Sequence, residues 1–227
     1  MVGLPGCGKT HMASRICRFL EFFHDIPSKI FNVGDYRRKM VGAKMPASFY
    51  DHNDPDSVAK RHEACNAASK DLIEFMKKDG VRVGCYDATN STRLRRNHIK
   101  KMIGDLGTKV LYIESICDDE EMLDNNIRSV KLSTPDYEGM DPEDARKDFV
   151  ERRNQYKDVY ETLTDDDGPQ VKVYNCRKFV VNNVRGYVPL KVVHYLMNLH
   201  TLPRTFYLTR HGKEIEHFYF LSLVLIN

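Results

Sequence analysis

Short apolar runs alternate with longer amphipathic stretches along most of the chain. The short runs predict strands at 29–33, 81–86, 108–114, 170–174 and 179–182. In the longer stretches, apolar residues recur every three or four positions, which predicts helices at 10–23, 54–79, 92–106, 118–130, 142–163 and 189–199. Strands that alternate with helices favour an α/β fold, in which a mostly parallel sheet carries helices on both faces.

A phosphate-binding motif opens the chain and leads directly into the first predicted helix. Gly3-Leu-Pro-Gly-Cys-Gly-Lys-Thr10 matches the pattern GxxxxGK[ST]. Glycines let backbone N–H groups converge on phosphate oxygens, and the helix N-terminus adds positive potential. Lys9 would reach the β- and γ-phosphates, and the Thr10 hydroxyl would be a ligand of Mg²⁺. The motif predicts a P-loop NTPase-type fold with a phosphate site formed by Gly3, Leu4, Pro5, Gly6, Cys7, Gly8, Lys9 and Thr10.

Only Met1 and Val2 precede this loop, although such a loop normally follows a buried strand. We therefore expect the strand that leads into the loop to be missing from this sequence. It has been lost, or Met1 is an internal residue of a longer protein.

A carboxylate stands at the end of the predicted strand 81–86. In open α/β sheets, ligands bind at the carboxyl ends of strands, and this class of site needs a carboxylate there to hold Mg²⁺ or its water shell. Asp87 is therefore a candidate metal ligand, and a role as base for the acceptor proton stays open. Thr89 and Asn90 add short polar side chains that could hold an acceptor hydroxyl. The alternative is an ordinary helix cap at this position.

Basic residues cluster near predicted strand ends, at 37–39, 93–96, 128–131 and 152–153. Arginine binds phosphate in a bidentate manner, so several such clusters in one cleft would suit a doubly anionic acceptor. Each cluster alone is also typical of a solvated surface. The sequence leaves open whether the clusters converge.

Composition and charge serve mainly to exclude classes of protein. With 41% hydrophobic and 30% charged residues, the 227-residue chain is typical of a globular protein. Its net charge of +3 gives no global basic field for nucleic acid. No apolar run approaches the roughly 20 residues that span a bilayer. The 6 cysteines lack metal-ligand spacing, and together with the absence of a signal peptide they predict reduced thiols and a cytoplasmic location.

Several motifs, in this order and with family-like gaps, resemble the kinase half of the 6-phosphofructo-2-kinase/fructose-2,6-bisphosphatase family. The phosphate loop is shared by many families, whereas the segments after it are far more specific. The motifs are residues 1–10, Phe31-Asn-Val-Gly-Asp-Tyr-Arg-Arg38, Asp87-Ala-Thr-Asn90 with Arg93-Leu-Arg-Arg96, Glu114-Ser-Ile-Cys117, Asn126-Ile-Arg-Ser-Val-Lys131 and Pro135-Asp-Tyr137.

The resemblance implies ATP- and Mg²⁺-dependent phosphorylation of the 2-hydroxyl of fructose 6-phosphate, which gives fructose 2,6-bisphosphate. It implies that Lys9, Asp87 and Cys117 are active-site residues. Because no step needs a thiolate, we expect Cys117 to have only a supporting role. The resemblance also leaves open whether the chain forms a homodimer. Besides the phosphate loop, the implied ATP site contains Asn126, Ile127, Arg128, Ser129, Val130 and Lys131. The implied sugar-phosphate ligands are Arg37, Arg61, Thr89, Arg95, Lys131, Arg152 and Tyr156.

The resemblance divides the chain near residue 203. We expect residues 1–203 to form the P-loop kinase domain and residues 204–227 to be the truncated start of a histidine-phosphatase domain with an unrelated apolar tail. Tyr207-Leu-Thr-Arg-His-Gly212 resembles the opening of that domain, but Lys213 replaces a family Glu and the further catalytic residues are absent. His211 is then vestigial, and we expect no bisphosphatase activity.

Two other functions stay open. A non-catalytic module that binds nucleotide or pairs with a homologue would fit the missing strand and the truncated phosphatase half. A kinase for polynucleotide 5′-hydroxyls can carry a similar Asp-x-Thr-Asn motif. The modest net charge and the lack of an aromatic stacking platform with interleaved basic residues argue against the second alternative.

Overall fold

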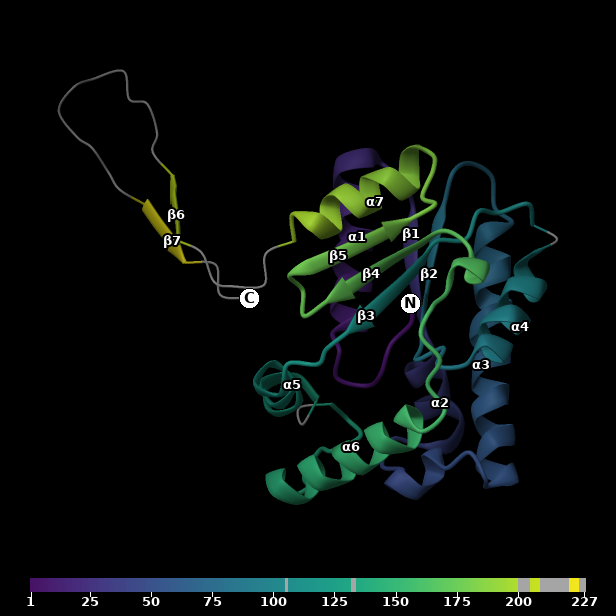
Figure 1. The fold of residues 1–227 in the computed structure, drawn as a ribbon, viewed down its shortest axis with the longest axis vertical. Helices are drawn as coiled ribbons and strands as arrows, with labels where there is room; N and C mark the ends of the chain where they lie inside the picture. Colours follow the sequence, from purple (N-terminus) through teal and green to yellow (C-terminus); the bar gives the residue numbers. More distant parts are fainter. Residues whose placement is uncertain (105, 132–133, 200–204, 209–220, 225–227) are drawn as a thin grey trace. The chain divides into compact units, whose positions relative to one another are not determined.

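The computed structural model describes residues 1–104, 106–131, 134–199, 205–208 and 221–224, with side chains for 1–104, 106–129 and 134–199. The chain divides into two units, Met1–Met197 and Asn198–Asn227. The first unit contains the α/β fold (Figure 1). Its elements are α1 (Lys9–His24), β1 (Ser28–Asn32), α2 (Val33–Val41), η1 (Ala47–Tyr50), α3 (Pro55–Met76), β2 (Val83–Asp87), α4 (Arg93–Gly104), β3 (Tyr112–Ile116), α5 (Glu120–Asn126), the π-helical η2 (Ile127–Lys131), α6 (Pro142–Lys157), η3 (Asp165–Asp167), β4 (Gln170–Tyr174), β5 (Lys178–Asn182) and α7 (Tyr187–Met197).

The first residues of the chain join two parts of the sheet. β1 pairs in parallel with β2, and β3 pairs in parallel with β4, which pairs antiparallel with β5. Val2 forms a parallel bridge with Glu114 in β3, and its N–H donates to the Ile113 carbonyl at 2.8 Å. On the other side, the Met1 amine donates to the Tyr86 carbonyl in β2 at 2.9 Å. The mostly parallel sheet predicted from the sequence is confirmed.

Helices cover both faces of this sheet. In β2, the Cys85 sulfur lies 3.5 Å from the Cys17 sulfur of α1, whereas the next residue, Tyr86, donates its hydroxyl hydrogen to the Cys65 carbonyl of α3. Because consecutive strand residues point to opposite faces, α1 and α3 lie on opposite sides of β2. Helix α1 presents a buried apolar stripe, as the spacing in the sequence predicts. The buried face of α3 consists of small residues and Leu72, and it includes Ser57 and Ser69.

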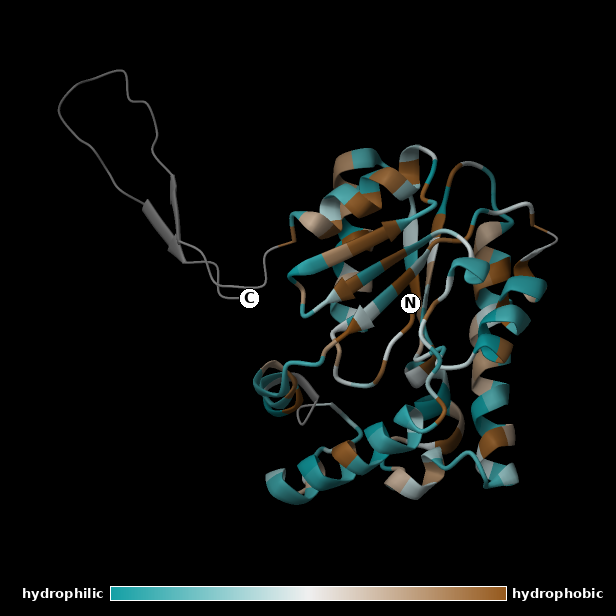
Figure 2. Cartoon of the chain, in the orientation of Figure 1, coloured by the Kyte–Doolittle hydropathy of each residue, from teal (hydrophilic) through white to brown (hydrophobic). Residues whose placement is uncertain are grey.

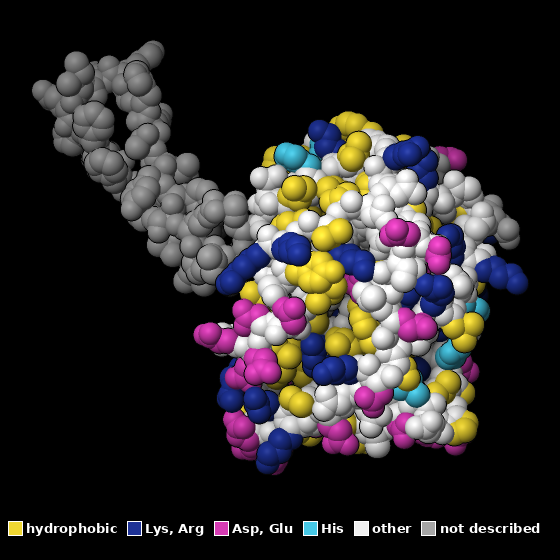
Figure 3. Space-filling model, viewed as in Figure 1, with side chains coloured by type: hydrophobic (Ala, Val, Ile, Leu, Met, Phe, Trp, Pro, Cys, Tyr) yellow, Lys and Arg dark blue, Asp and Glu magenta, His cyan; other side chains and the backbone are white. Residues whose placement is uncertain are grey.

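The apolar core follows the same layers. One cluster joins Phe31 of β1 and Tyr86 of β2 to Ala68 and Leu72 of α3. A second cluster lies under α6, where Phe149 packs with three other buried side chains, Ile127, Tyr137 and Ala145. Figure 2 shows β5 mainly as hydrophobic and α6 mainly as hydrophilic, whereas hydrophobic and hydrophilic residues alternate in β4. Apolar side chains are also exposed on β5 and α7, namely Val180, Val181, Tyr187, Leu190 and Met197, and Figure 3 shows several hydrophobic side chains at the surface of the face in view.

Several predicted boundaries were wrong, among them the following three. The strand predicted at 29–33 ends at Asn32, because the Asn32 side chain accepts a hydrogen bond from the Asp35 amide and caps α2, a helix that the pattern did not predict. The strand predicted at 108–114 begins only at Tyr112, opposite the first residue of β4. The helix predicted at 142–163 ends at Lys157.

The early end of α6 is explained by a buried carboxylate. The side chain of Glu114 in β3 is fully buried and accepts hydrogen bonds from the Tyr160 hydroxyl at 2.6 Å and the Thr162 hydroxyl at 2.8 Å. It also accepts one from the Leu163 amide at 3.2 Å. A buried carboxylate needs such donors, so residues 160–163 leave the helix to supply them.

The second unit contains a strand pair, in which β6 (Thr205–Leu208) runs antiparallel to β7 (Leu221–Val224). Arg210, His211 and Gly212 of the phosphatase-like opening lie outside the described residues. Within the part of the chain that the structure describes, no helix combines the length and the apolar character needed to cross a membrane.

A buried ion pair ties α4 to η3. Arg96 is 1% exposed, and its Nε donates to Asp167 Oδ1 at 2.8 Å, while its Nη1 donates to the Asn90 and Glu161 carbonyls. Burial alone would raise the pKa of Asp167. The hydrogen bonds from Arg96 and the Thr164 amide outweigh burial, and the pKa lies below its ordinary value.

This pair predicts a large stability difference between two neighbouring arginines. Arg96→Met should lower the free energy of unfolding in urea at pH 7 by about 3–5 kcal/mol, because it leaves the Asp167 charge buried. The control Arg93→Met removes an exposed arginine and should cost less than about 1 kcal/mol. Since the folded pKa of Asp167 is depressed, its stabilisation is present above the unfolded value of 3.8 and is lost as the pH falls further. Equal losses for both variants would contradict this account.

Candidate active site

The loop before α1 has a backbone that only glycine fits. Gly3, Gly6 and Gly8 have φ angles of +139°, +85° and +77°. A Cβ atom on Gly3 would lie 2.4 Å from the Ser115 carbonyl oxygen, and one on Gly6 would lie 2.9 Å from Leu123 Cδ1. A Cβ on Gly8 would meet no atom within 4 Å, so space is open beside the residue that precedes α1. This open space beside the N-terminus of a helix fits the phosphates of a nucleotide.

Side chains behind the loop hold its carbonyl groups. Arg153 of α6 donates to the Pro5 carbonyl, lies 3.3 Å from the Cys7 sulfur, and donates to the Cys117 carbonyl at 3.3 Å. The Asn126 amide donates to the Gly6 carbonyl at 3.2 Å, and the Ser115 hydroxyl donates to the Cys7 carbonyl. These contacts attach the loop to β3, α5 and α6, which preorganises it for a ligand.

Lys9 begins α1 and is buried against the loop. Its ammonium group donates to the Leu4 carbonyl at 2.8 Å. A phosphate oxygen is a stronger acceptor for an ammonium group than a neutral carbonyl. The Lys9 side chain is therefore already placed at the loop and would exchange one acceptor for another when phosphate binds.

Asp87 and Thr10 meet at a single amide side chain. Asp87 is the last residue of β2 and is 2% exposed. The Asn32 amide, from the end of β1, donates to Asp87 Oδ2 at 2.7 Å and to the Thr10 hydroxyl at 3.5 Å. The carboxylate therefore faces the phosphate loop, and three elements converge there. Asn32 was missed as a site residue, although it ends the strand that pairs with the strand of Asp87.

The donor set at this point fits Mg²⁺. This ion prefers oxygen ligands and usually combines one or two protein oxygens with phosphate oxygens and water. Asp87 offers a carboxylate and Thr10 an exposed hydroxyl. The described residues contain no group of three or more His, Cys, Asp or Glu side chains that could hold a metal ion alone. Metal binding here would therefore need phosphate oxygens as further ligands.

Three arginines converge on one carboxylate. Asp136 is buried and accepts hydrogen bonds from Arg37 at 2.8 Å, Arg38 at 3.2 Å and Arg152 at 3.2 Å. Arg37 also donates to two loop carbonyls, Gly42 and Ala43, so it holds the cluster together. Arg38 also pairs with Asp35 at 2.6 Å, so three positive charges face two negative ones and the cluster keeps a net charge of +1. The sequence left this convergence open, and Asp136 was missed as its centre.

Tyr50 connects this cluster to the other predicted ligands. The Arg152 guanidinium carbon lies 4.0 Å from the centroid of the Tyr50 ring, Tyr156 packs against the same ring, and Arg61 donates to the Tyr50 carbonyl at 2.8 Å. Tyr50 is 3% exposed, yet neither its hydroxyl nor Arg152 Nε has a hydrogen-bond partner among the described residues. Buried polar groups are normally paired, so these two atoms indicate a polar ligand or water.

Arg95 and Thr89 lie where α4 begins, after Asp87. Arg95 contacts the Tyr86 hydroxyl at 3.5 Å, and the Thr89 carbonyl accepts a hydrogen bond from the Gly3 amide. Burial, together with the charges of Arg95, His98 and Arg61, lowers the pKa of His62. The two predicted arginines therefore flank the same histidine, which links α3 to the start of α4.

Of the remaining predicted site residues, some contact the phosphate loop and others lie away from it. Asn126 touches the loop, whereas Ile127 is buried in the core under α6. Arg128 is exposed and forms ion pairs with Asp124 and Glu143. The backbone of Ser129, Val130 and Lys131 belongs to η2, and the Val130 and Lys131 side chains lie outside the described residues. Cys117 follows β3 and lies behind the loop rather than beside Asp87.

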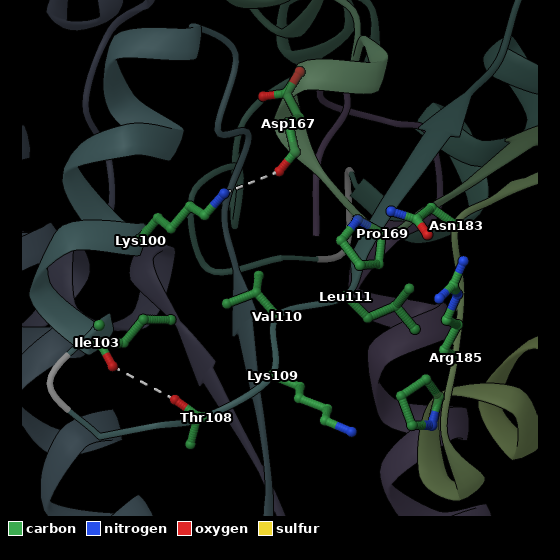
Figure 4. A pocket seen from close by; sticks show the side chains of 12 residues that line it. Lys100, Ile103, Thr108, Lys109, Val110, Leu111, Asp167, Pro169, Asn183 and Arg185 are labelled. Atoms are coloured by element: carbon green, nitrogen blue, oxygen red, sulfur yellow. Dashed lines mark hydrogen bonds between the residues drawn. The ribbon is translucent and has the colours of Figure 1, made fainter.

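A cavity of about 490 Å³ lies at the other end of the sheet (Figure 4). It is lined by residues that precede β3 and β4, such as Thr108, Leu111 and Pro169, and by Lys100 of α4. Because β3 and β4 begin here, the cavity is at the opposite end from the phosphate loop. It contains none of the predicted site residues.

The chain is similar to one family over most of its length. The family model described as 6-phosphofructo-2-kinase matches residues 1–203. A 6-phosphofructo-2-kinase/fructose-2,6-bisphosphatase of Gallus gallus is 39% identical over 218 residues, covering 94% of this chain and 46% of that protein. A Caenorhabditis elegans protein with the same name is 40% identical over 224 residues, covering 94% and 49%. The chain therefore spans about half the length of the curated relatives it matches.

A solved structure shows the same fold. Chaetomium thermophilum Kti12, crystallised in complex with ADP-AlF3, has a TM-score of 0.52 and is 16% identical. The match covers 87% of this chain and 95% of that chain.

The Asn32 bridge predicts that its loss weakens nucleotide binding without unfolding α2. Asn32→Ser keeps a good helix cap but is too short to reach Asp87. Groups that orient metal ligands are typically worth about 10–100-fold in affinity, so titration calorimetry should show a loss of that size for Mg·ADP. Helix stability should change by less than about 1 kcal/mol. The control Asn32→Ala should lose both the affinity and the cap. Wild-type affinity in Asn32→Ser would contradict the bridge.

Proposed function

The chain belongs to the 6-phosphofructo-2-kinase family, and we propose that it transfers the γ-phosphoryl group of ATP to the 2-hydroxyl of fructose 6-phosphate. The product is fructose 2,6-bisphosphate. The observation that carries the proposal is the contact of Asn32 with both Asp87 and Thr10 beside the phosphate loop. Phosphoryl transfer depends mainly on positioning and charge neutralisation, and this contact supports both.

The phosphate loop and its support form the ATP side of the proposal. The loop amides and Lys9 bind the phosphates, and Asn126 and Arg153 hold the loop from behind. Thr10 and Asp87 would hold Mg²⁺, which when bound neutralises charge on the phosphates. The Asn32 hydrogen bond orients the Asp87 carboxylate, which supports its role as a metal ligand rather than only a helix cap.

The arginine cluster around Asp136 forms the acceptor side. Its excess positive charge supports binding of the 6-phosphate group, since arginine pairs well with phosphate oxygens. The Tyr50 hydroxyl and Arg152 Nε are buried donors for which a sugar phosphate would supply acceptors. Arg61, Arg95 and Tyr156 extend the same surface. Several cationic groups near one ligand also favour a charged acceptor over a neutral sugar.

We also propose that the protein acts in the cytoplasm. The 6 cysteines are free thiols in the structure, which supports a reducing compartment.

The proposal predicts product from ATP, Mg²⁺ and fructose 6-phosphate. Acid-labile fructose 2,6-bisphosphate should accumulate with the purified chain. Lys9→Met should lower the rate of product formation at least about 100-fold, because the phosphates lose the positive charge of the Lys9 ammonium group. The control Lys100→Met, at the far cavity, should keep the rate. The non-catalytic alternative would be favoured if ATP raised the thermal stability of the chain but no product formed. In that case wild type and Lys9→Met would not differ in turnover.

We expect the loss of the Tyr50 hydroxyl to weaken substrate binding without lowering the stability of the fold. Tyr50→Phe removes a buried hydroxyl that has no protein partner among the described residues, so the free energy of unfolding should stay the same or rise. The KM for fructose 6-phosphate should rise about 5–10-fold, while the KM for ATP stays unchanged. The control Tyr160→Phe removes a hydroxyl bound to Glu114 and should lower stability. An unchanged KM for fructose 6-phosphate would exclude Tyr50 from the acceptor site.

A further inference from the structure

The cavity at the end of the sheet opposite the phosphate loop has no part in the proposed function (Figure 4). Its volume of about 490 Å³ lies within the range of roughly 300–1,000 Å³ that is typical of small-molecule sites. Four segments of the described chain line it, namely the end of α4, the residues before β3, the residues before β4 and the connection from β5 to α7. The cavity therefore has room for an organic molecule, not only for an inorganic ion.

The middle of the lining is apolar. Figure 4 shows Val110 and Leu111 there, between cationic side chains. The apolar side chains of the lining are Ile103, Val110, Leu111, Pro169 and Pro189. Val110 and Leu111 are only partly buried, so a ligand that covers them removes further apolar surface from water. The lining therefore favours a ligand with a hydrocarbon or ring portion.

Three cationic side chains surround this apolar part, namely Lys100, Lys109 and Arg185. Lys109 and Arg185 form no hydrogen bond or ion pair with any described residue. Lys100 donates to the Asp167 carbonyl at 3.4 Å and has no carboxylate partner in the part of the chain that the structure describes. Cationic groups around one cavity repel one another, and an anion between them would remove that repulsion.

The carboxylate in the lining does not balance these charges. It belongs to Asp167, and no other described residue of the lining is acidic. Arg96 Nε donates to Asp167 Oδ1 at 2.8 Å, and Arg96 Nη2 donates to Asp167 Oδ2 at 3.3 Å. Because the buried Arg96 occupies both carboxylate oxygens, the cations of the lining have no carboxylate of their own in the cavity.

Two further features favour an anion. The Asn183 side chain lines the cavity and has no hydrogen-bond partner among the described residues, so its amide can donate to a ligand. A Cβ atom on Gly186 would lie 3.5 Å from Lys109 Nζ, which places this ammonium group beside the start of α7. The first turn of α7 has no acidic residue, so the positive end of the helix dipole adds to the charge of Lys109.

We propose that this cavity binds a small organic dianion. Arg185 pairs with two oxygens of a phosphate or carboxylate group, and Lys100 and Lys109 add positive charge from the other segments. The hydrocarbon or ring portion of the ligand covers Val110 and Leu111. A phosphate monoester and a dicarboxylate share this chemistry, and the titrations below distinguish them. No residue of the phosphate loop or of the arginine cluster takes part, so the site does not depend on the proposed function.

The test is titration calorimetry of the full chain at neutral pH with two aromatic dianions, phenyl phosphate and phthalate. At least one of them should bind with a Kd below about 1 mM. Benzyl alcohol has the ring without the charge, and inorganic phosphate has the charge without the ring, so both should bind at least about tenfold more weakly. Binding of phenyl phosphate alone supports the site and assigns it to phosphate monoesters, whereas binding of phthalate alone supports it and assigns it to dicarboxylates.

Substitutions decide whether the dianion occupies the cavity. Lys109→Met and Arg185→Met should each raise the Kd of the dianion about tenfold, because each removes a charge-assisted contact. Both side chains are exposed, so the melting temperature should stay close to that of the wild type. The matched controls Lys101→Met and Arg177→Met remove exposed cations outside the lining and should keep the wild-type Kd. Arg152→Met, in the arginine cluster, should also keep it.

The proposal is overturned if neither dianion binds at concentrations up to about 10 mM, or if Lys109→Met and Arg185→Met bind it as tightly as the wild type. It is also overturned if Arg152→Met abolishes binding, because the dianion would then occupy the arginine cluster. Equal affinity for benzyl alcohol or inorganic phosphate has the same consequence. If the chain makes no fructose 2,6-bisphosphate, the proposed function fails, whereas these titrations still decide whether the cavity is a site.

Discussion

The register between β1 and β2 is the constraint on which the site depends. Asn32 and Asp87 are partners at the ends of these parallel strands, so one amide can donate to the Asp87 carboxylate and reach Thr10. A slip by one residue would turn Asn32 to the other face of the sheet and leave a buried carboxylate without this donor. The same amide caps α2, so pairing, helix start and ligand geometry are set together.

Helix α6 connects the two ends of the site. Two consecutive residues on it have different tasks, since Arg152 donates to Asp136 and Arg153 donates to the phosphate loop. The helix must end before residue 160, where the following segment supplies donors to the buried Glu114 in β3. The position of α6 is therefore fixed by β3, and the distance between the loop and the arginine cluster is fixed with it.

The sequence predicted what depends on local pattern. The phosphate loop, α1, β4 and the place of Asp87 at the end of β2 follow from spacing and periodicity. Helix α2 was missed because a side chain at the end of a strand starts it, not an apolar stripe. The arginine cluster could not be predicted, because Asp136 joins Arg37 and Arg152 across about a hundred residues of sequence. Such contacts depend on packing, which periodicity does not specify.

The central claim is that Thr10 and Asp87 face one metal ion beside the phosphate loop. The most direct measurement is a crystal structure of the chain with ADP and Mn²⁺, in which anomalous scattering locates the metal. We expect one peak in contact with the Thr10 hydroxyl and an ADP phosphate oxygen, with Asp87 as a ligand directly or through one water. A nucleotide-bound metal on the opposite side of β2 from Asp87 would contradict the account.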